Sequence, residues 1–300
     1  MEQHLIYGRT CNTISRRNFS LALITSLASL YVPSVMAKNN DVEVDLNEET
    51  ISLPALIRGK VYQLETTLFR PDTTNRHPLV VINHGTSENT DKNRERARFI
   101  SASRALVGQG FAVAVPMRRG YGNSEGGQVR LEGADLTDYG LENALDIHGA
   151  ISYLKSQDYV DPQRMVVIGQ STGGLSTMAY LSMADQGVLG GLNFHGGVRP
   201  HNLNSDPKLD ARITAFTTYA KSTRIPSMWF YTENDHSSHP EFIVRLHDAY
   251  QQAGGNATLV QLPAFGEDGH YLFSREEGLG IWWPKASTFL SALIGTPNQV

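Results

Sequence analysis

Cysteine is nearly absent from this 300-residue chain, in which Cys11 is the only one. Cys11 lies in an N-terminal segment that we expect to be removed, so the mature protein is expected to contain no cysteine. A chain without cysteine has no intrachain disulfide framework, no cysteine nucleophile and no zinc site with cysteine ligands. The lack of cysteine therefore excludes disulfide-stabilised folds, cysteine-dependent enzymes and cysteine-ligated zinc proteins for the mature chain.

The sequence also lacks a strong charge of either sign and any internal repeat. Its formal net charge is −4, from 26 basic and 30 acidic residues. Without a basic stripe or an acidic tail, nucleic acid is not an expected partner. A length of 300 residues, 40% of them hydrophobic and 19% charged, is typical of one large globular domain.

A long hydrophobic run is missing as well. The best candidate, Leu21–Met36, has about 16 residues and includes Pro33, whereas a membrane-spanning helix needs roughly 20 strongly apolar residues. Arg16-Arg17 precedes this run and Val35-Met36-Ala37 ends it with small residues, which is the order of a cleaved export signal. The arginine pair, followed by Asn, Phe and Ser, resembles a bacterial twin-arginine signal. We therefore expect residues 1–37 to be a signal peptide, with an uncleaved membrane anchor as the alternative.

The rest of the chain divides into a short lead-in and one domain. Residues 38–50 are polar and acidic and are expected to be flexible, and residues 51–295 are expected to form a single α/β domain. Removal of residues 1–37, which hold three arginines and one glutamate, changes the net charge from −4 to −6. This chain is expected to be periplasmic or secreted, without stable membrane insertion after cleavage.

Strand-like and helix-like segments alternate through the expected domain. Short apolar runs bounded by Gly or Pro are typical of strands buried on both faces. The strands are predicted at residues 51–57, 60–69, 79–83, 111–116, 165–169, 191–194, 227–231 and 258–262. The helices are predicted at residues 94–108, 141–155, 175–184, 208–220, 240–253 and 284–293. This order predicts a mostly parallel eight-stranded sheet flanked by helices, with the active site at the carboxyl ends of the strands.

One of these strand ends carries a candidate nucleophile. Residues 165–174 read Met-Val-Val-Ile-Gly-Gln-Ser-Thr-Gly-Gly, so a strand, a tight turn and the start of a helix contain the pattern Gly-x-Ser-x-Gly. Such a turn holds the serine in a strained conformation above the sheet, and Gly169 and Gly173 leave room where backbone segments pass close together. The pattern predicts that Ser171 is a nucleophile, and the alternative is a bystander serine in a glycine-rich turn.

A serine nucleophile needs a base and an acid that orients the base. Asp235 lies in a polar loop a few residues beyond the strand at 227–231, where the acid is expected, and is predicted to be the acid, with Glu233 as the alternative. His270 follows the last strand in a polar, glycine-containing loop and is predicted to be the base. His236 and His239 flank the acid loop and His247 lies on a predicted helix, so they are less well placed.

The developing oxyanion needs backbone N–H donors. One donor is expected from Thr172, next to the nucleophile, and the other from Thr86, because the strand at 79–83 ends in His84-Gly85-Thr86. His84 either braces this loop by hydrogen bonds or has a direct chemical role, and the bracing role is preferred.

Together these motifs resemble a known family, the dienelactone hydrolase branch of the α/β-hydrolases. The motifs are Asn83-His84-Gly85, the run from Arg119-Gly120-Tyr121 to Gly126, Gly169–Gly174, Asp235 and Gly269-His270. The prolyl oligopeptidase and acetyl-xylan-esterase-like branches are also similar, and the resemblance covers roughly residues 55–295. It implies hydrolysis of esters or lactones through an acyl-enzyme, with no metal and no organic cofactor. Dienelactone hydrolases use a cysteine nucleophile where this chain has Ser171, so the lactone substrate is not carried over.

The expected function is therefore hydrolysis of carboxylic esters with small to medium acyl groups. The alternatives are a serine peptidase of the prolyl-oligopeptidase-like type and a non-catalytic binding protein on a hydrolase fold. A metal site at His236 and His239 is not expected, because no other ligands cluster near them.

The sequence leaves two features of the site open. Arg118 and Arg119 follow the fourth predicted strand and either line the pocket or hold their own loop. The stretch 198–226 has room for one helix and a loop only, so a small or absent lid and a fairly open site are expected. The residues predicted to line the pocket are Pro200, His201, Asn202, Asn204 and the range 215–219.

Overall fold

The structure is a computed structural model that describes residues 46–86, 94–131, 135–183, 185–199 and 207–295. The expected signal peptide and most of the expected lead-in lie outside these ranges, as do residues 200–204 of the predicted pocket. Among the described residues, no helix is both long and apolar enough to cross a membrane.

The described ranges contain eight strands, which form one sheet in the order β1-β2-β4-β3-β5-β6-β7-β8. The strands are β1 (Glu49–Ile57), β2 (Lys60–Phe69), β3 (His77–Asn83), β4 (Ala112–Pro116), β5 (Val160–Gln170), β6 (Val188–Phe194), β7 (Ser227–Thr232) and β8 (Ala257–Leu262). β1 pairs with β2 and β2 with β4 in antiparallel register, while all other neighbours are parallel. The predicted mostly parallel eight-stranded sheet is confirmed.

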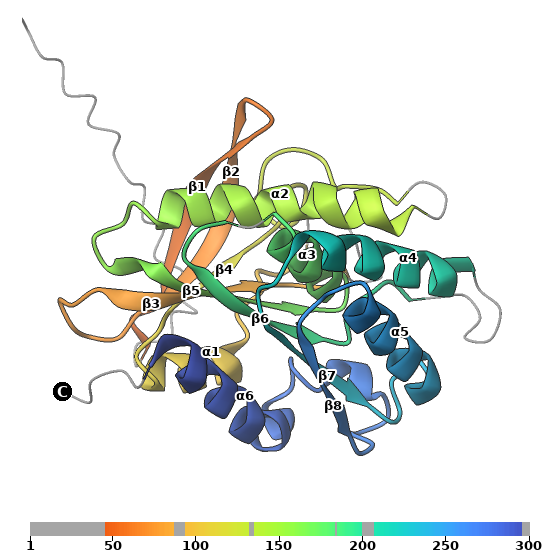
Figure 1. Cartoon of the computed structure of the whole chain (residues 1–300). Helices are drawn as coiled ribbons and strands as arrows, with labels where there is room; N and C mark the ends of the chain where they lie inside the picture. The colour runs from red at the N-terminus through yellow and green to blue at the C-terminus, as the bar shows by residue number, and fades with distance from the viewer. Residues whose placement is uncertain (1–45, 87–93, 132–134, 184, 200–206, 296–300) are drawn as a thin grey trace, which may run out of the picture. The chain divides into compact units, whose positions relative to one another are not determined.

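In the described part of the chain, six α-helices cover the two faces of this sheet (Figure 1). They are α1 (Ile100–Gly108), α2 (Leu136–Leu154), α3 (Thr172–Leu181), α4 (Pro207–Ser222), α5 (Pro240–Gln252) and α6 (Leu279–Ile294). Helices α2 to α5 share one apolar core with the sheet, and α1 and α6 share another. β3 is buried along its whole length between these layers, which explains why its sequence is a continuous apolar run.

The structure corrects several predicted boundaries. α2 begins at Leu136 rather than at residue 141, α6 at Leu279 rather than at residue 284, and β5 at Val160 rather than at residue 165. The helix predicted from residue 94 begins only at Ile100, because Phe99 adopts a left-handed conformation with φ of 47° that a helix cannot continue through. The strand predicted from residue 51 begins at Glu49, and Leu46 and Glu48 before it are buried. The last residues of the expected lead-in therefore belong to the domain. Glu48 is held there by ion pairs with Arg96 and Arg98.

Candidate active site

Ser171 lies at the turn between β5 and α3, at the carboxyl edge of the sheet. Its backbone has φ of 58° and ψ of −125°, a region that L-residues enter only when the surrounding structure enforces it. A Cβ on Gly169 would collide with the carbonyl of Gly173, and a Cβ on Gly173 with the carbonyl of Asn83. The two glycines therefore permit the tight turn that the sequence predicted, and this turn presents the half-buried Ser171 side chain at the end of the sheet.

Asp235 and His270 are brought together by loops that follow neighbouring strands. His270 Nδ1 lies 3.0 Å from Asp235 Oδ1, and the backbone N–H of Ser237 donates to the same oxygen at 2.8 Å. Because an ionised carboxylate only accepts hydrogen bonds, the ring proton of neutral His270 is on Nδ1 and Nε2 is free to act as a base. Burial opposes ionisation of Asp235, but the hydrogen bond from His270 and the nearby imidazoles lower the pKa of Asp235 to about 2.

Ser171 and His270 face the same cavity, which has a volume of about 1250 Å³. Gln170 fixes the loop that carries His270 to the turn that carries Ser171, since its Nε2 donates to the carbonyl of His270 at 2.8 Å. Among the described contacts there is no hydrogen bond from Ser171 Oγ to the His270 ring. Such bonds are often loose without substrate and tighten in the reacting complex.

The two predicted oxyanion donors, Thr86 and Thr172, are in contact with each other. The Thr86 N–H donates to Thr172 Oγ1 at 2.8 Å, and Arg118 Nη2 donates to the same hydroxyl oxygen at 3.2 Å. Thr172 is the first residue of α3, where backbone N–H groups have no partner within the helix. The structure therefore brings both residues to the nucleophile, with the Thr86 amide already hydrogen-bonded to a neighbouring hydroxyl.

His84 braces the loop after β3. The backbone N–H of Arg118 donates to His84 Nε2 at 3.1 Å, so the ring proton is on Nδ1, which donates to the carbonyl of Gly85 at 2.8 Å. Burial and the cationic Arg118 and Arg94 hold the pKa of His84 well below its usual value. A neutral ring with both nitrogens engaged agrees with the bracing role preferred from the sequence.

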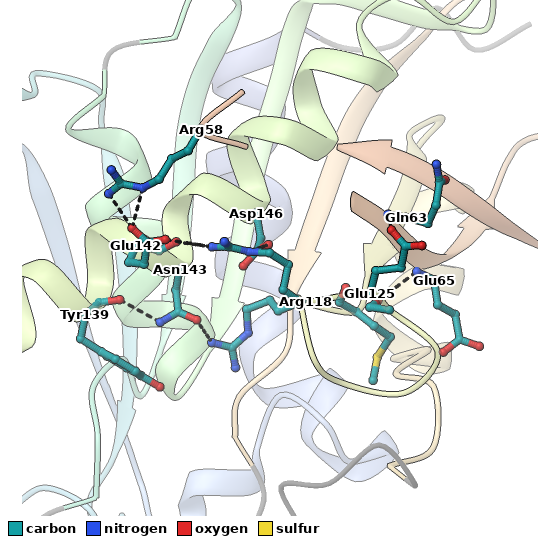
Figure 2. A network of polar contacts seen from close by, with 12 residues as sticks. Arg58, Gln63, Glu65, Arg118, Glu125, Tyr139, Glu142, Asn143 and Asp146 are labelled. Atoms are coloured by element: carbon teal, nitrogen blue, oxygen red, sulfur yellow. Dashed lines mark hydrogen bonds and ion pairs between the residues drawn. The ribbon is translucent and has the colours of Figure 1, made fainter. Parts of the chain in front are cut away.

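Arg118 and Arg119 are both buried and hold their surroundings together. Arg118 Nη1 donates to Asn143 Oδ1 at 2.7 Å, as Figure 2 shows, and Asn143 in turn donates to the carbonyl of Tyr139. Arg119 pairs with Asp146 at 2.7 Å and with Glu142 at 3.3 Å. Both guanidinium groups are thus engaged with the protein, and neither residue lines the cavity.

The cavity walls differ from those predicted. Segment 94–101, which precedes and begins α1, forms much of one wall, and Tyr271 and Arg199 lie on others. Residues 215–219 do not line it, because Ala215, Phe216 and Tyr219 are buried in the core between helices. The prediction that residues 215–219 line the pocket was wrong. Their side of α4 packs into the core, where Phe216 contacts Trp229 of β7.

The competing candidates are placed away from the reacting groups. Glu233 is exposed, the His236 side chain is 61% exposed, and His239 precedes α5. His247 Nε2 lies 3.0 Å from the carbonyl of Ala257 and ties α5 to β8. Within the described part of the chain, no group of three or more His, Cys, Asp or Glu residues could hold a metal ion.

Two buried residues near the acid were missed from the sequence. His195 follows β6, and its ring centroid lies 5.5 Å from that of His270. Arg212 on α4 donates from Nη2 to Ser238 Oγ at 2.7 Å, within the loop that carries Asp235. His195 could have been found from the sequence, because it follows the carboxyl end of a predicted strand, where active sites of parallel sheets lie. Nothing in the sequence distinguishes Arg212 from a surface arginine.

Comparisons with known proteins agree with this architecture. The sequence profile of the Prolyl oligopeptidase family matches residues 97–188. The Quorum-quenching protein AidA of Acinetobacter baumannii is 34% identical over 112 residues, which are 37% of this chain and 33% of that protein. The chain therefore matches about a third of the length of this curated relative.

Solved structures show the likeness over most of the chain. The Pyrococcus furiosus esterase Pf2001 superposes with a TM-score of 0.61 at 17% identity, covering 88% of this chain and 97% of the esterase. The acylaminoacyl peptidase of Pyrococcus horikoshii superposes with a TM-score of 0.62 at 18% identity, covering 84% of this chain and 43% of the peptidase. Together with the strand order and the turn at Ser171, these likenesses show that the chain has the α/β-hydrolase fold, as the resemblance in its sequence implied.

Proposed function

We propose that this α/β-hydrolase cleaves carboxylic esters with small to medium acyl groups through an acyl-enzyme. The observation that carries the proposal is that strained Ser171 and the base His270, oriented by Asp235 at 3.0 Å, open onto one cavity. This arrangement supplies a nucleophile, a base and an orienting carboxylate in the chain order of this fold.

In the proposed reaction Ser171 Oγ attacks the acyl carbonyl while His270 Nε2 takes the hydroxyl proton. The resulting oxyanion accepts hydrogen bonds from the amides of Thr172 and Thr86, and at Thr86 it takes the place of the Thr172 hydroxyl. His270 then gives the proton to the leaving alcohol. Water attacks the acyl-enzyme by the same route in reverse and releases the acid and free Ser171. No cofactor takes part in this scheme.

A panel of soluble esters tests the proposal. Wild-type protein is expected to hydrolyse p-nitrophenyl esters of short and medium acyl chains, and Ser171→Ala is expected to lose this activity by several orders of magnitude. Because a matched relative is named a quorum-quenching protein, small bacterial signalling molecules belong in the panel. Turnover of long-chain lipids alone would contradict the substrate class.

A peptidase is the second candidate, because the Prolyl oligopeptidase profile matches residues 97–188. The chain spans 43% of the acylaminoacyl peptidase that it resembles. Peptidyl and acyl p-nitroanilides, compared with esters of the same acyl group, distinguish the two activities. Faster cleavage of the anilides would favour the peptidase, and no turnover of any substrate would favour a binding protein.

We further propose that the chain is exported as a folded protein and acts in the periplasm or outside the cell. The arginine pair, the apolar run and the small residues ending at Ala37 support this proposal. The small-molecule ester is its proposed partner, with neither nucleic acid nor stable membrane insertion involved.

A further inference from the structure

Several buried polar atoms of Asp235 and of two residues near its loop, His195 and Arg212, have no hydrogen-bond partner among the described residues. Asp235 Oδ2, His195 Nδ1 and both Nε and Nη1 of Arg212 are buried and have no hydrogen-bond partner among the described residues. The other carboxylate oxygen, Oδ1, is already bonded to His270 and to the Ser237 N–H. Buried polar groups in folded proteins are bonded to protein or to ordered water. Asp235 therefore has one carboxylate oxygen without a donor, and the two residues that interact with it electrostatically, His195 and Arg212, have donors without an acceptor.

The tautomer of His195 makes it one of these donors. The backbone N–H of Thr232 donates to His195 Nε2 at 3.2 Å, so Nε2 carries no proton and the ring proton is on Nδ1. Burial lowers the pKa of His195 to about 4, although the nearby Asp235 opposes this shift. His195 is thus a neutral ring whose Nδ1–H has no bonded acceptor, and it interacts electrostatically with the carboxylate of Asp235.

Arg212 reaches the same region from α4. Its side chain is only 1% exposed and its guanidinium lies 4.4 Å from the ring centroid of Phe242. Nη2 donates to Ser238 Oγ at 2.7 Å, and the Ser238 N–H donates to the carbonyl of Asp235 at 3.2 Å. No carboxylate among the described residues is in direct contact with the guanidinium, and a buried cation without a counter-charge is costly. Burial lowers the pKa of Arg212, and interactions with Tyr231 and Asp235 oppose this shift.

We propose that His195 and Arg212 are positioning residues for the acid Asp235, linked to its free oxygen by one buried water molecule. The water accepts from His195 Nδ1–H and from an Arg212 N–H and donates to Asp235 Oδ2. These three hydrogen bonds are the number typical of a buried water. The link fixes the carboxylate so that Oδ1 stays directed at His270, and it ties α4 to the catalytic loop. The proposal rests on the proposed function, because it assigns Asp235 the role of triad acid.

The link also changes how strongly the Asp235 carboxylate stabilises the positive charge that His270 acquires when it takes the proton of Ser171. A donor and a cation on Oδ2 withdraw negative charge from the carboxylate, so their removal favours the imidazolium form. The other ionisable groups near His270 are Asp268, which accepts its backbone N–H, and Tyr271 beside it. Loss of either positioning residue should therefore move the acidic limb of the kcat/KM profile to higher pH.

Four variants test this link. Arg212→Gln removes the cation, Arg212→Lys retains it, and His195→Asn removes the ring donor. Asparagine suits that position because His195 has φ of 53°, which asparagine tolerates. Arg119→Gln is the matched control, since Arg119 is also a buried arginine but is paired with Asp146 outside the cavity. Folding of each variant is checked by circular dichroism and thermal unfolding before kinetics.

Arg212→Gln and His195→Asn are expected to lower kcat about tenfold, with KM nearly unchanged and the acidic limb moved to higher pH. Arg212→Lys is expected to restore most of the rate, and Arg119→Gln to leave the profile in place. Unchanged kcat and an unmoved acidic limb in the folded His195→Asn and Arg212→Gln variants would overturn the inference. A high-resolution crystal structure without a water between Asp235 Oδ2 and His195 Nδ1 would overturn the bridging role. Full ester hydrolysis by Ser171→Ala would instead overturn the proposed function itself.

Discussion

Two acidic residues of the loop after β7, Glu233 and Asp235, have similar chemistry but different surroundings. Asp235 is buried and hydrogen-bonded to His270, whereas Glu233 is exposed to solvent. The sequence favoured Asp235 by its distance from the strand end alone. The structure adds the contact that makes this choice testable.

Asp235→Asn is expected to reduce kcat for ester hydrolysis by about 10⁴-fold, because an amide in that place no longer selects the productive tautomer of His270. Glu233→Gln is the control and is expected to stay within about twofold of the wild-type rate, since an exposed side chain away from the reacting groups has little influence on them. Steady-state kinetics on one p-nitrophenyl ester measures both. The reverse ranking would assign the acid to Glu233.

His195 predicts how the stability of the protein depends on pH. Burial lowers the pKa of His195 to about 4, while an unfolded chain keeps histidine near about 6.5. Between these values the unfolded state binds a proton that the folded state does not, so the free energy of unfolding falls as pH falls. The contribution of His195 is about 3 kcal/mol, and buried His84 acts in the same direction.

Urea unfolding at pH 7 and at pH 4 measures this effect. The loss of stability between the two pH values is expected to be smaller in His195→Asn than in the wild type. His236→Asn is the control, because its side chain is 61% exposed, and it should keep the wild-type loss. An equal loss in all three proteins would contradict the buried neutral state of His195.

At the scale of elements, the inner strands such as β3 and β4 were predictable because their apolar runs reflect burial on both faces of one sheet. The outer strands β1, β2 and β8 are buried only in part and carry polar residues between apolar ones. The start of α1 was not predictable in the same way. Residues 94–99 look helical in isolation, but Arg96 and Arg98 are held by Glu48, about fifty positions away. Because of these long-range ion pairs and the left-handed conformation of Phe99, residues 94–99 do not form the expected first turns of the helix. They contribute to the lining of the cavity instead. The water-linked residues behind Asp235 were missed for a similar reason, since α4 brings Arg212 to that loop only in the folded chain.

Helix α6 is anchored by one of its two adjacent tryptophans. Trp282 is fully buried and packs against Phe194 and Phe273, whereas Trp283 is only partly buried. Trp282→Ala is expected to lower the free energy of unfolding by about 3–5 kcal/mol, and Trp283→Ala by clearly less. Chemical denaturation of both variants provides the comparison. Equal losses would mean that α6 is not held to the sheet mainly by Trp282.

At the scale of the whole molecule, the chain combines a proposed export signal with a hydrolase domain. In a bacterial host, substitution of both Arg16 and Arg17 by Lys is expected to leave the full-length precursor inside the cell, because the twin-arginine pathway recognises the pair. The wild-type chain should yield a mature form starting after Ala37. Cell fractionation measures where each form is found, and N-terminal sequencing identifies the cleavage site. Unchanged export of the variant would indicate an ordinary signal peptide instead.

The central claim is that Ser171 is a nucleophile activated by His270. A fluorophosphonate probe, followed by peptide mass spectrometry, tests it most directly. The account predicts one covalent adduct per chain, located on Ser171, abolished in Ser171→Ala and strongly slowed in His270→Ala. Equal labelling of wild type and Ser171→Ala, or an adduct on another residue, would contradict it.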